Sequence, residues 1–382
     1  MLRLVEGSIR LPALVTAHSH AFQRGLRGKA QRGPFSNPTD DFWSWRHAMY
    51  QLAEGLDPER IYQLSRLAYE ELRGTGVRTV GEFHYVHHQL DGTPYDDRVA
   101  LAEAVIQAAR DEGLRICLLR VVYHRAGAGG APEGVQRRFS DEALDDALRD
   151  TDELWSRYAH AEDVRVGIAP HSVRAVPPAW LKPIADFAAR RKLPLHMHVA
   201  EQPAEIAACL EETGRRPVQL LGDHGILGPS FCAVHATHLD PDEVTLLGET
   251  ASRVCLCPTT ERDLGDGLAP VGPLHRAGVR FCVGIDSHVL CAPLEELRAV
   301  ELGERLRTGQ RVVLRDPERS TAELLWAAGS QLGAEACGFD DPGGDIALDR
   351  GGASLALVND EGLLDAIVFS GDNRLFVADP AR

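Results

Sequence analysis

Short apolar runs recur along the chain and alternate with amphipathic stretches of helical period. The runs are apolar on both faces, whereas a stretch such as DDRVALAEAVIQAARDEGL repeats apolar residues every three or four positions. Strands that are apolar on both faces and alternate with helices are typical of a parallel sheet. The pattern predicts eight strands, over residues 12–20, 77–85, 115–124, 164–172, 193–201, 230–239, 252–261 and 279–288.

Eight strand–helix units within about 300 residues favour a closed (β/α)8 barrel over an open doubly wound sheet. No GxGxxG motif follows a strand, which argues against dinucleotide binding. We therefore predict an α/β fold with a TIM-type catalytic barrel over residues 12–310. Residues 1–11 and 311–382 are left for a C-terminal helix near 321–338 and a small β appendage, with strand candidates SLALVND (354–360) and AIVFSGD (366–372).

Polar and titratable residues gather at the C-terminal ends of the predicted strands. The strands end in HSH, HY, H, HS, HVAE, HATH, TTE and DSH. Barrel enzymes build their active sites at this end of the strands, whereas structural polar residues would be scattered. The clustering predicts an enzyme. The long segment 21–50 after the first strand is consistent either with a lid over the barrel mouth or with a loop that extends over the surface.

Two histidines one residue apart end the first strand. Because residues i and i+2 of a strand point to the same side, His18 and His20 can bind the same ligand. Imidazoles combined with a carboxylate are ligands that Zn²⁺ prefers, and their joint occurrence at one end of a barrel predicts a metal site. The other candidates at strand ends are His198, Glu201, His235 and Asp286.

Composition limits the classes of partner. Of the 382 residues, 44% are hydrophobic and 25% charged, as in ordinary soluble proteins, and the formal charge of −15 argues against nucleic acid or an anionic membrane. An acidic substrate must therefore be bound by a local cation. No secretory signal and no apolar stretch of about 20 residues is present. The eight cysteines include no CxxC pair, so we expect reduced thiols and a cytoplasmic protein.

The strand-end pattern resembles the amidohydrolase superfamily over residues 12–310: HxH, then HxxE on the fifth strand, His on the sixth and Asp on the eighth. More narrowly, HSHAFQRG, EFHYVHH, HSVRAV, HVAEQ, VHATH, TERDLGDG and DSH resemble the formimidoylglutamate deiminase family of histidine degradation. That resemblance implies hydrolysis of N-formimino-L-glutamate to N-formyl-L-glutamate and ammonia. Members of the family carry a longer N-terminal segment, so we expect a reduced appendage here.

The resemblance also implies roles for individual residues. Binuclear members need a carboxylated lysine on the fourth strand, and none of Lys29, Lys182 and Lys192 ends a strand, so one zinc ion is expected. His196 can share the face of His198, which we prefer because it stands three residues before Glu201. The implied metal ligands are His18, His20, His198 and Asp286. The implied catalytic residues are Glu201, His235 and Asp286, and the implied substrate-binding residues are Gln23, Tyr85, His171 and Arg174.

Two other interpretations stay open. The same chemistry can act on another formimino, guanidino or cyclic amidine compound. Alternatively, the barrel binds a small-molecule ligand without catalysis and the metal is structural, although a free acid at Glu201 beside the metal argues against that. Symmetry statistics favour a homodimer among oligomers, and the sequence leaves the oligomeric state open.

Overall fold

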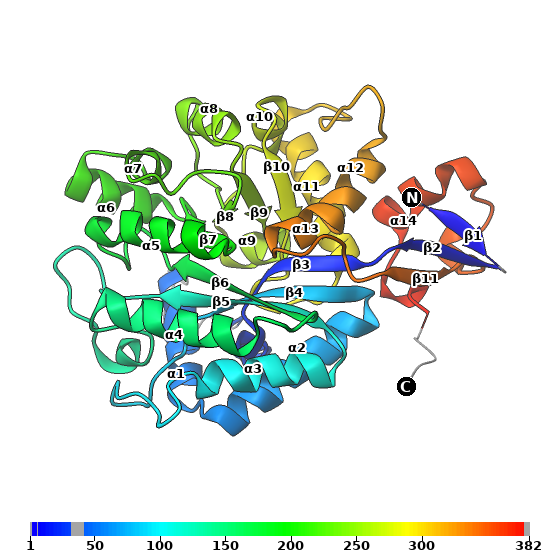
Figure 1. The fold of residues 1–382 in the computed structure, drawn as a ribbon. Helices are drawn as coiled ribbons and strands as arrows, with labels where there is room; N and C mark the ends of the chain where they lie inside the picture. The colour runs from blue at the N-terminus through cyan, green and yellow to red at the C-terminus, as the bar shows by residue number, and fades with distance from the viewer. Residues whose placement is uncertain (1, 6, 32–41, 378–382) are drawn as a thin grey trace.

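The central feature of the structure is a sheet of eight parallel strands that curves into a nearly closed barrel, with helices around it (Figure 1). The computed structural model describes residues 2–5, 7–31 and 42–377. Neighbouring strands are consecutive in the chain, which confirms the predicted barrel. The barrel strands are β3 (Leu14–Ser19), β4 (Val77–His84), β5 (Arg115–Val122), β6 (Val164–Pro170), β7 (Leu195–Val199), β8 (Phe231–His235), β9 (Arg253–Leu256) and β10 (Arg280–Val283).

The barrel closes where β3 meets the segment that follows β10. Ser19 forms a parallel bridge with Asp286. The amide of His20 donates to the carbonyl oxygen of Asp286 at 2.9 Å, and the amide of Asp286 donates to the carbonyl oxygen of His18 at 3.1 Å. Backbone hydrogen bonds therefore bring the first and last barrel strands together at their C-terminal ends.

Most of the helices around the barrel begin at a proline. At the first helical position the missing N–H is harmless and the ring holds φ at a helical value. At α2, the Asp57 side chain also caps the helix by accepting from the Arg60 amide at 2.7 Å. The helices with such a proline are α2 (Pro58–Gly74), α5 (Pro178–Arg191), α6 (Pro203–Thr213), α7 (Pro217–Asp223), α8 (Pro241–Glu249), α9 (Pro258–Leu264) and α11 (Pro293–Thr308). The others around the barrel are α1 (Phe42–Glu54), α3 (Ala100–Asp111), α4 (Leu144–Arg157) and α10 (Val271–Arg276).

Two short helices, α12 (Thr321–Ala328) and α13 (Gln331–Ala336), pack against β10, and α13 also packs against β3. The Val15 amide, near the start of β3, donates to the carbonyl oxygen of Gly329 at 2.8 Å. The sequence predicted one helix over 321–338, and the structure divides it between Ala328 and Gln331. These helices therefore cover the end of the barrel at which the strands begin.

A small antiparallel sheet lies beside the barrel, to the right in Figure 1. It consists of β1 (Arg3–Val5), β2 (Ser8–Pro12) and β11 (Asp345–Asp349), in the order β1-β2-β11. Apolar and polar positions alternate in β2 and β11, and the register pairs Ile346 with Leu11 and Leu348 with Ile9, all of them buried. The chain thus has the small β appendage that the sequence predicted.

Both C-terminal strand candidates are wrong. Residues 354–360 contain short 3-10 turns, η3 (Ala353–Leu355) and the start of η4 (Asp360–Gly362), and residues 366–372 belong mostly to helix α14 (Leu363–Ser370). Leu363 and Ile367 are buried at helical spacing where α14 packs against α11 and α12. A short apolar run such as AIVF has no periodicity that separates a strand from a helix, so the packing decided the outcome.

The structure has all eight cysteines as free thiols, seven of them buried. Within the described ranges, every helix is too short or too polar to cross a bilayer. The division of the chain at residues 12 and 310 stays a prediction.

Candidate functional site

Imidazoles from two strands converge with one carboxylate at the C-terminal end of the barrel. His18 lies on β3 and His20 directly follows it, His198 lies on β7, and Asp286 follows β10. Asp286 Oδ1 lies 3.6 Å from His18 Nε2 and 3.5 Å from His20 Nε2. The Nε2 atoms of His18 and His198 are 3.1 Å apart. All four side chains are buried, so their donor atoms face one another instead of solvent.

The electrostatics of this cluster suit a cation. Burial and the neighbouring imidazole of His20 lower the pKa of His18 well below its usual value. Burial lowers the pKa of His20 to about 3. The imidazoles are therefore neutral near pH 7 and present lone pairs, as metal binding requires. Donor atoms of His18, His20 and Asp286 lie within 4.8 Å of one another, and those of His18 and His198 lie in a second such group with His235. The arrangement can hold a small divalent cation.

A second group of titratable residues adjoins the first. His235 ends β8, and its Nε2 lies 3.7 Å from Glu201 Oε1 and 3.7 Å from Asp286 Oδ2. Its Nδ1 lies 3.2 Å from Glu261 Oε1 on α9. Burial lowers the pKa of His235, but the charge of Glu201 and the hydrogen bond with Glu261 outweigh it and raise that pKa well above its usual value. His235 is therefore a buried cation surrounded by carboxyl groups.

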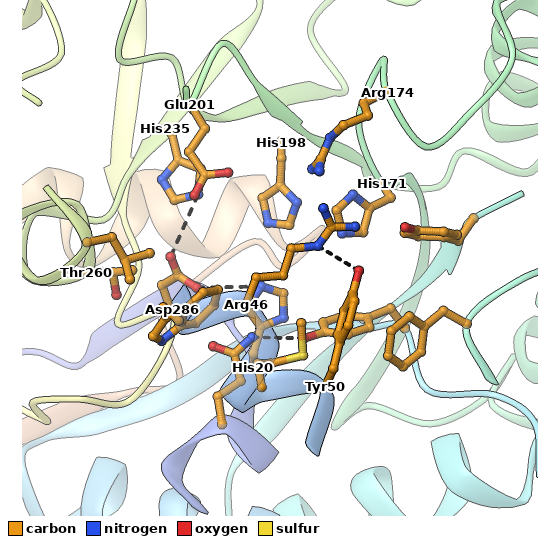
Figure 2. Close-up of a pocket in the computed structure, with 17 residues that line it drawn as sticks. His20, Arg46, Tyr50, His171, Arg174, His198, Glu201, His235, Thr260 and Asp286 are labelled. Carbon is orange, nitrogen blue, oxygen red and sulfur yellow. Dashed lines mark hydrogen bonds and ion pairs between the residues drawn. The ribbon is translucent and has the colours of Figure 1, made fainter. Parts of the chain in front are cut away.

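A pocket opens onto both groups and contains about 590 Å³ of empty space. Figure 2 shows Glu201, His235 and Asp286 at one side and Arg174, His171 and Tyr50 at the other. Gln23 Nε2 donates to the Tyr85 hydroxyl at 2.9 Å. All four residues that the resemblance assigned to substrate line this pocket, namely Gln23, Tyr85, His171 and Arg174.

Two guanidinium groups, those of Arg46 and Arg174, also line the pocket. Arg46 lies on α1, where its Nε donates to the Tyr50 hydroxyl at 2.6 Å (Figure 2). Burial, followed by the charges of Arg174 and Arg46, lowers the pKa of His171 well below its usual value, so both cations act on the same part of the pocket. Planar guanidinium groups bind carboxylates through paired hydrogen bonds. The pocket can thus bind an anionic molecule at one end and expose it to the clustered imidazoles and carboxyl groups at the other.

The profile of the protein family described as "Amidohydrolase family" matches residues 9–374. The chain belongs to this family. This amidohydrolase is 38% identical to formimidoylglutamate deiminase of Pseudomonas aeruginosa, over 96% of this chain and 82% of that protein. It is 29% identical to 8-oxoguanine deaminase of the same organism, over 95% of this chain and 76% of that one. A crystal structure of an amidohydrolase from Brucella melitensis superposes with a TM-score of 0.86 at 31% identity, covering 98% of this chain and 90% of that chain.

The sequence patterns missed several residues of this amidohydrolase's site. Arg46 and Tyr50 belong to the segment 21–50, for which the sequence allowed either a lid or a surface loop. Residues 32–41 of that segment lie outside the described residues, and residues 42–54 form α1, which lines the pocket. Glu261 belongs to the TERDLGDG motif, whose role the sequence left open. Only the contact with His235, brought in from another strand, shows what Glu261 does.

Other histidines near the strand ends have structural partners. His196 Nε2 lies 2.8 Å from the carbonyl oxygen of Ala336, at the opposite end of the barrel from the pocket, so His198 is the one directed to the cluster. His87 Nε2 lies 2.9 Å from the carbonyl oxygen of Val121. His124 Nδ1 lies 2.9 Å from the carbonyl oxygen of Asp141. In these contacts, backbone carbonyl groups pair with the ring nitrogens.

Proposed function

We propose that this amidohydrolase hydrolyses N-formimino-L-glutamate to N-formyl-L-glutamate and ammonia, a step of histidine degradation, in the cytoplasm. The observation that carries the proposal is a single pocket with buried metal-ligating groups and Glu201 at one end and two guanidinium groups at the other. Formimidoylglutamate deiminase of Pseudomonas aeruginosa, 38% identical, supports the same substrate. A dicarboxylic amidine presents one reactive carbon and two anionic groups, which matches the two ends of the pocket.

We assign one zinc ion to His18, His20, His198 and Asp286. Three neutral imidazoles and one carboxylate are an ordinary zinc ligand set. The Nε2 atoms of His18 and His198 lie 3.1 Å apart, and His18 Nε2 lies 3.6 Å from Asp286 Oδ1, so these atoms can share one ion. When bound, zinc supplies the Lewis acidity that makes a water molecule nucleophilic near neutral pH. The chain has no lysine at a strand end to bridge a second ion, which supports one metal.

The protein side chains then handle the protons. Asp286 accepts a proton from the attacking water, whose oxygen bonds to the formimino carbon. The buried His235 cation, 3.7 Å from Asp286 Oδ2, stabilises negative charge on that oxygen. Both protons of the water end on the departing imino nitrogen: Asp286 passes on the first, and Glu201 takes the remaining hydroxyl proton of the intermediate and delivers it, so that the C–N bond breaks, the C=O bond forms and ammonia leaves. The remaining group is the formyl amide of the product.

The opposite end of the pocket binds the glutamate part. We assign the carboxylates to Arg174 and Arg46, because guanidinium forks pair with carboxylates bidentately. Gln23, Tyr85 and His171 provide further hydrogen-bonding groups on the same wall. A purine-like amidine carries no carboxylate for the two arginines, so the pocket favours the dicarboxylic substrate over the cyclic amidines of the more distant relatives.

Ammonia release from a panel of amidines tests the substrate. The purified protein is assayed with N-formimino-L-glutamate, N-formimino-L-aspartate, a guanidino acid and 8-oxoguanine, and its metal content is measured by elemental analysis. We expect the first compound to give the highest kcat/KM and the protein to contain about one zinc per chain, as a mononuclear catalytic site holds. Turnover of another amidine with N-formimino-L-glutamate inert would remove the proposed function.

Glu201→Gln tests catalysis against a purely structural metal. Losing a general acid and base is expected to lower kcat by about 10²–10⁴-fold while zinc content stays unchanged. Glu211→Gln, at an exposed glutamate of α6, is the matched control and should keep wild-type activity. Full activity in Glu201→Gln would exclude Glu201 from the reaction.

A further inference from the structure

The TERDLGDG motif places a buried carboxyl group, Asp266, behind the catalytic glutamate. Asp266 follows α9, and its amide donates to the carbonyl oxygen of Glu261 at 2.9 Å. Its own carbonyl oxygen lies 2.8 Å from His238 Nε2, and its Oδ1 accepts from Gln202 Nε2. The flanking glycines, Gly265 at φ +71° and Gly267 at φ +128°, adopt backbone conformations that other residues rarely adopt. The LGDG turn therefore holds Asp266 in one place.

Asp266 faces the groups that the proposed reaction uses. Its side chain is 3% exposed, and its Oδ2 has no hydrogen-bond partner among the described residues. Ligand atoms of Glu201, His235 and Asp266 lie within 4.8 Å of one another. Charged groups face it from four elements, namely Glu201 after β7, His235 on β8, Glu261 on α9 and Asp286 after β10.

Two carboxyl groups this close do not ionise independently. When one is charged, the like charge disfavours ionisation of the other. Burial and then the charge of Glu201 raise the pKa of Asp266 to about 8. Asp266 is the more enclosed of the two, whereas Glu201 lines the pocket, so Asp266 is the member that keeps its proton near pH 7.

We propose that Asp266 is a positioning residue for Glu201: it is the neutral partner of a carboxyl pair, so that the negative charge of the pair resides on Glu201 before each turnover. This inference rests on the proposed function for Glu201. Gln202, the residue after Glu201, connects the pair because its amide binds Asp266. The motifs HVAEQ and TERDLGDG thereby act together, although they lie on different strands and loops.

The pH dependence of kcat/KM for the zinc-loaded enzyme tests this role. In the wild type, ionisation of Asp266, with its pKa near 8, adds a second negative charge beside Glu201 and repels a dicarboxylic substrate, so kcat/KM falls above about pH 8. Asp266→Asn mimics the neutral acid. In this variant we expect the plateau of kcat/KM to stay within about threefold of wild type. We expect the fall of kcat/KM at alkaline pH to move up by at least about one pH unit. Asp263→Asn, at an exposed aspartate of α9, should match the wild type.

Equal loss of activity at every pH in Asp266→Asn, with an unmoved alkaline fall, would overturn the proposal and make Asp266 merely structural. If Asp266→Asn fails to fold, Gln202→Met replaces it. In Gln202→Met the amide donor to Asp266 is lost, so the ionised form of Asp266 is less stable. The fall of kcat/KM at alkaline pH should therefore move to higher pH. A fall at the wild-type pH would overturn the proposal.

Infrared difference spectra provide a readout that needs no substrate. At pH 7 the wild type and Asp263→Asn should show a protonated-carboxyl C=O band whose intensity is lower in Asp266→Asn. An unchanged band would overturn the inference even if N-formimino-L-glutamate is turned over. Loss of the band in Asp266→Asn, together with no turnover of N-formimino-L-glutamate by the wild type, would support the neutral state of Asp266 and refute the proposed substrate. A failure of this inference can therefore be distinguished from a failure of the proposed function.

Discussion

Two arginine side chains line the end of the pocket that we propose binds the substrate. The chain as a whole carries a formal charge of −15 and repels anions, so binding depends on the local cations Arg46 and Arg174. Arg174 follows HS at the end of a predicted strand, and the family resemblance singled it out. Arg46 precedes a histidine within an aromatic-rich helix and gives no local sign of a role, since only the packing of α1 brings it to the pocket.

Removing either guanidinium should weaken substrate binding more than it slows chemistry. For Arg174→Met and Arg46→Met we expect KM for N-formimino-L-glutamate to rise by about 10–100-fold, because hydrogen bonds to charged groups contribute roughly 1.5–3 kcal/mol. Steady-state kinetics measure this, with kcat expected to change less than KM. Arg262→Met, at an arginine 60% exposed and paired with Glu295, is the control. An unchanged KM with a lower kcat would contradict a binding role.

Among the elements, β3 is closely enclosed on both sides; it carries the proposed metal ligand His18 and leads directly into a second one, His20. Both segments beside it have a glycine facing it. A Cβ on Gly81 of β4 would lie 2.4 Å from the carbonyl oxygen of Ala17, and one on Gly284 after β10 would lie 2.7 Å from His18 Cβ. Any side chain at these positions must push β3 outward, and the ligand histidines move with it.

Gly284→Ala should therefore damage the metal site. We expect His18 to be displaced and zinc to bind at least about tenfold more weakly, in line with the fine geometric tolerance of metal ligands. Competition with a chromophoric chelator measures the affinity. Gly74→Ala is the control, because nothing lies within 4 Å of its added Cβ and its φ is not in the left-handed region. Wild-type zinc affinity in Gly284→Ala would show that β3 tolerates the shift.

At the scale of the whole molecule, the proposed metal site joins the two edges of the barrel sheet. Its ligands come from the first strand, the fifth strand and the segment after the eighth, so a bound ion links parts that are far apart in the chain. The backbone bridge between Ser19 and Asp286 is another link at this closure. Metal binding should thus stabilise the closed barrel as well as activate water.

Chelation should lower both activity and thermal stability. A ligand that binds the native state alone stabilises it by about 4 kcal/mol at a thousandfold excess over Kd, and that loss should lower Tm by several degrees. Calorimetry of the metal-free and zinc-restored protein measures the difference. In His18→Asn the zinc-dependent shift should be much smaller. Identical Tm values with and without zinc in the wild type would contradict a link across the closure.

The order of residues was enough to predict the barrel and the end of it that carries the polar, titratable side chains. Strand and helix periods are local properties, so eight strand–helix units could be predicted, and the HxH spacing on a strand placed His18 and His20 on one side. Parallel strands share one C-terminal edge, so His198, His235 and Asp286 could be predicted to meet there. Glu201 joined them through its spacing from His198.

Tertiary structure alone decided what depends on distances between remote segments. The pairing of β8 with β9 brought Glu261 to His235, the turn after α9 brought Asp266 close to Glu201, and the packing of α1 brought Arg46 to the pocket. It also made residues 363–370 a helix instead of a strand. Burial and the charges of spatial neighbours set the pKa of a group, and neither quantity is a property of nearby positions in the chain.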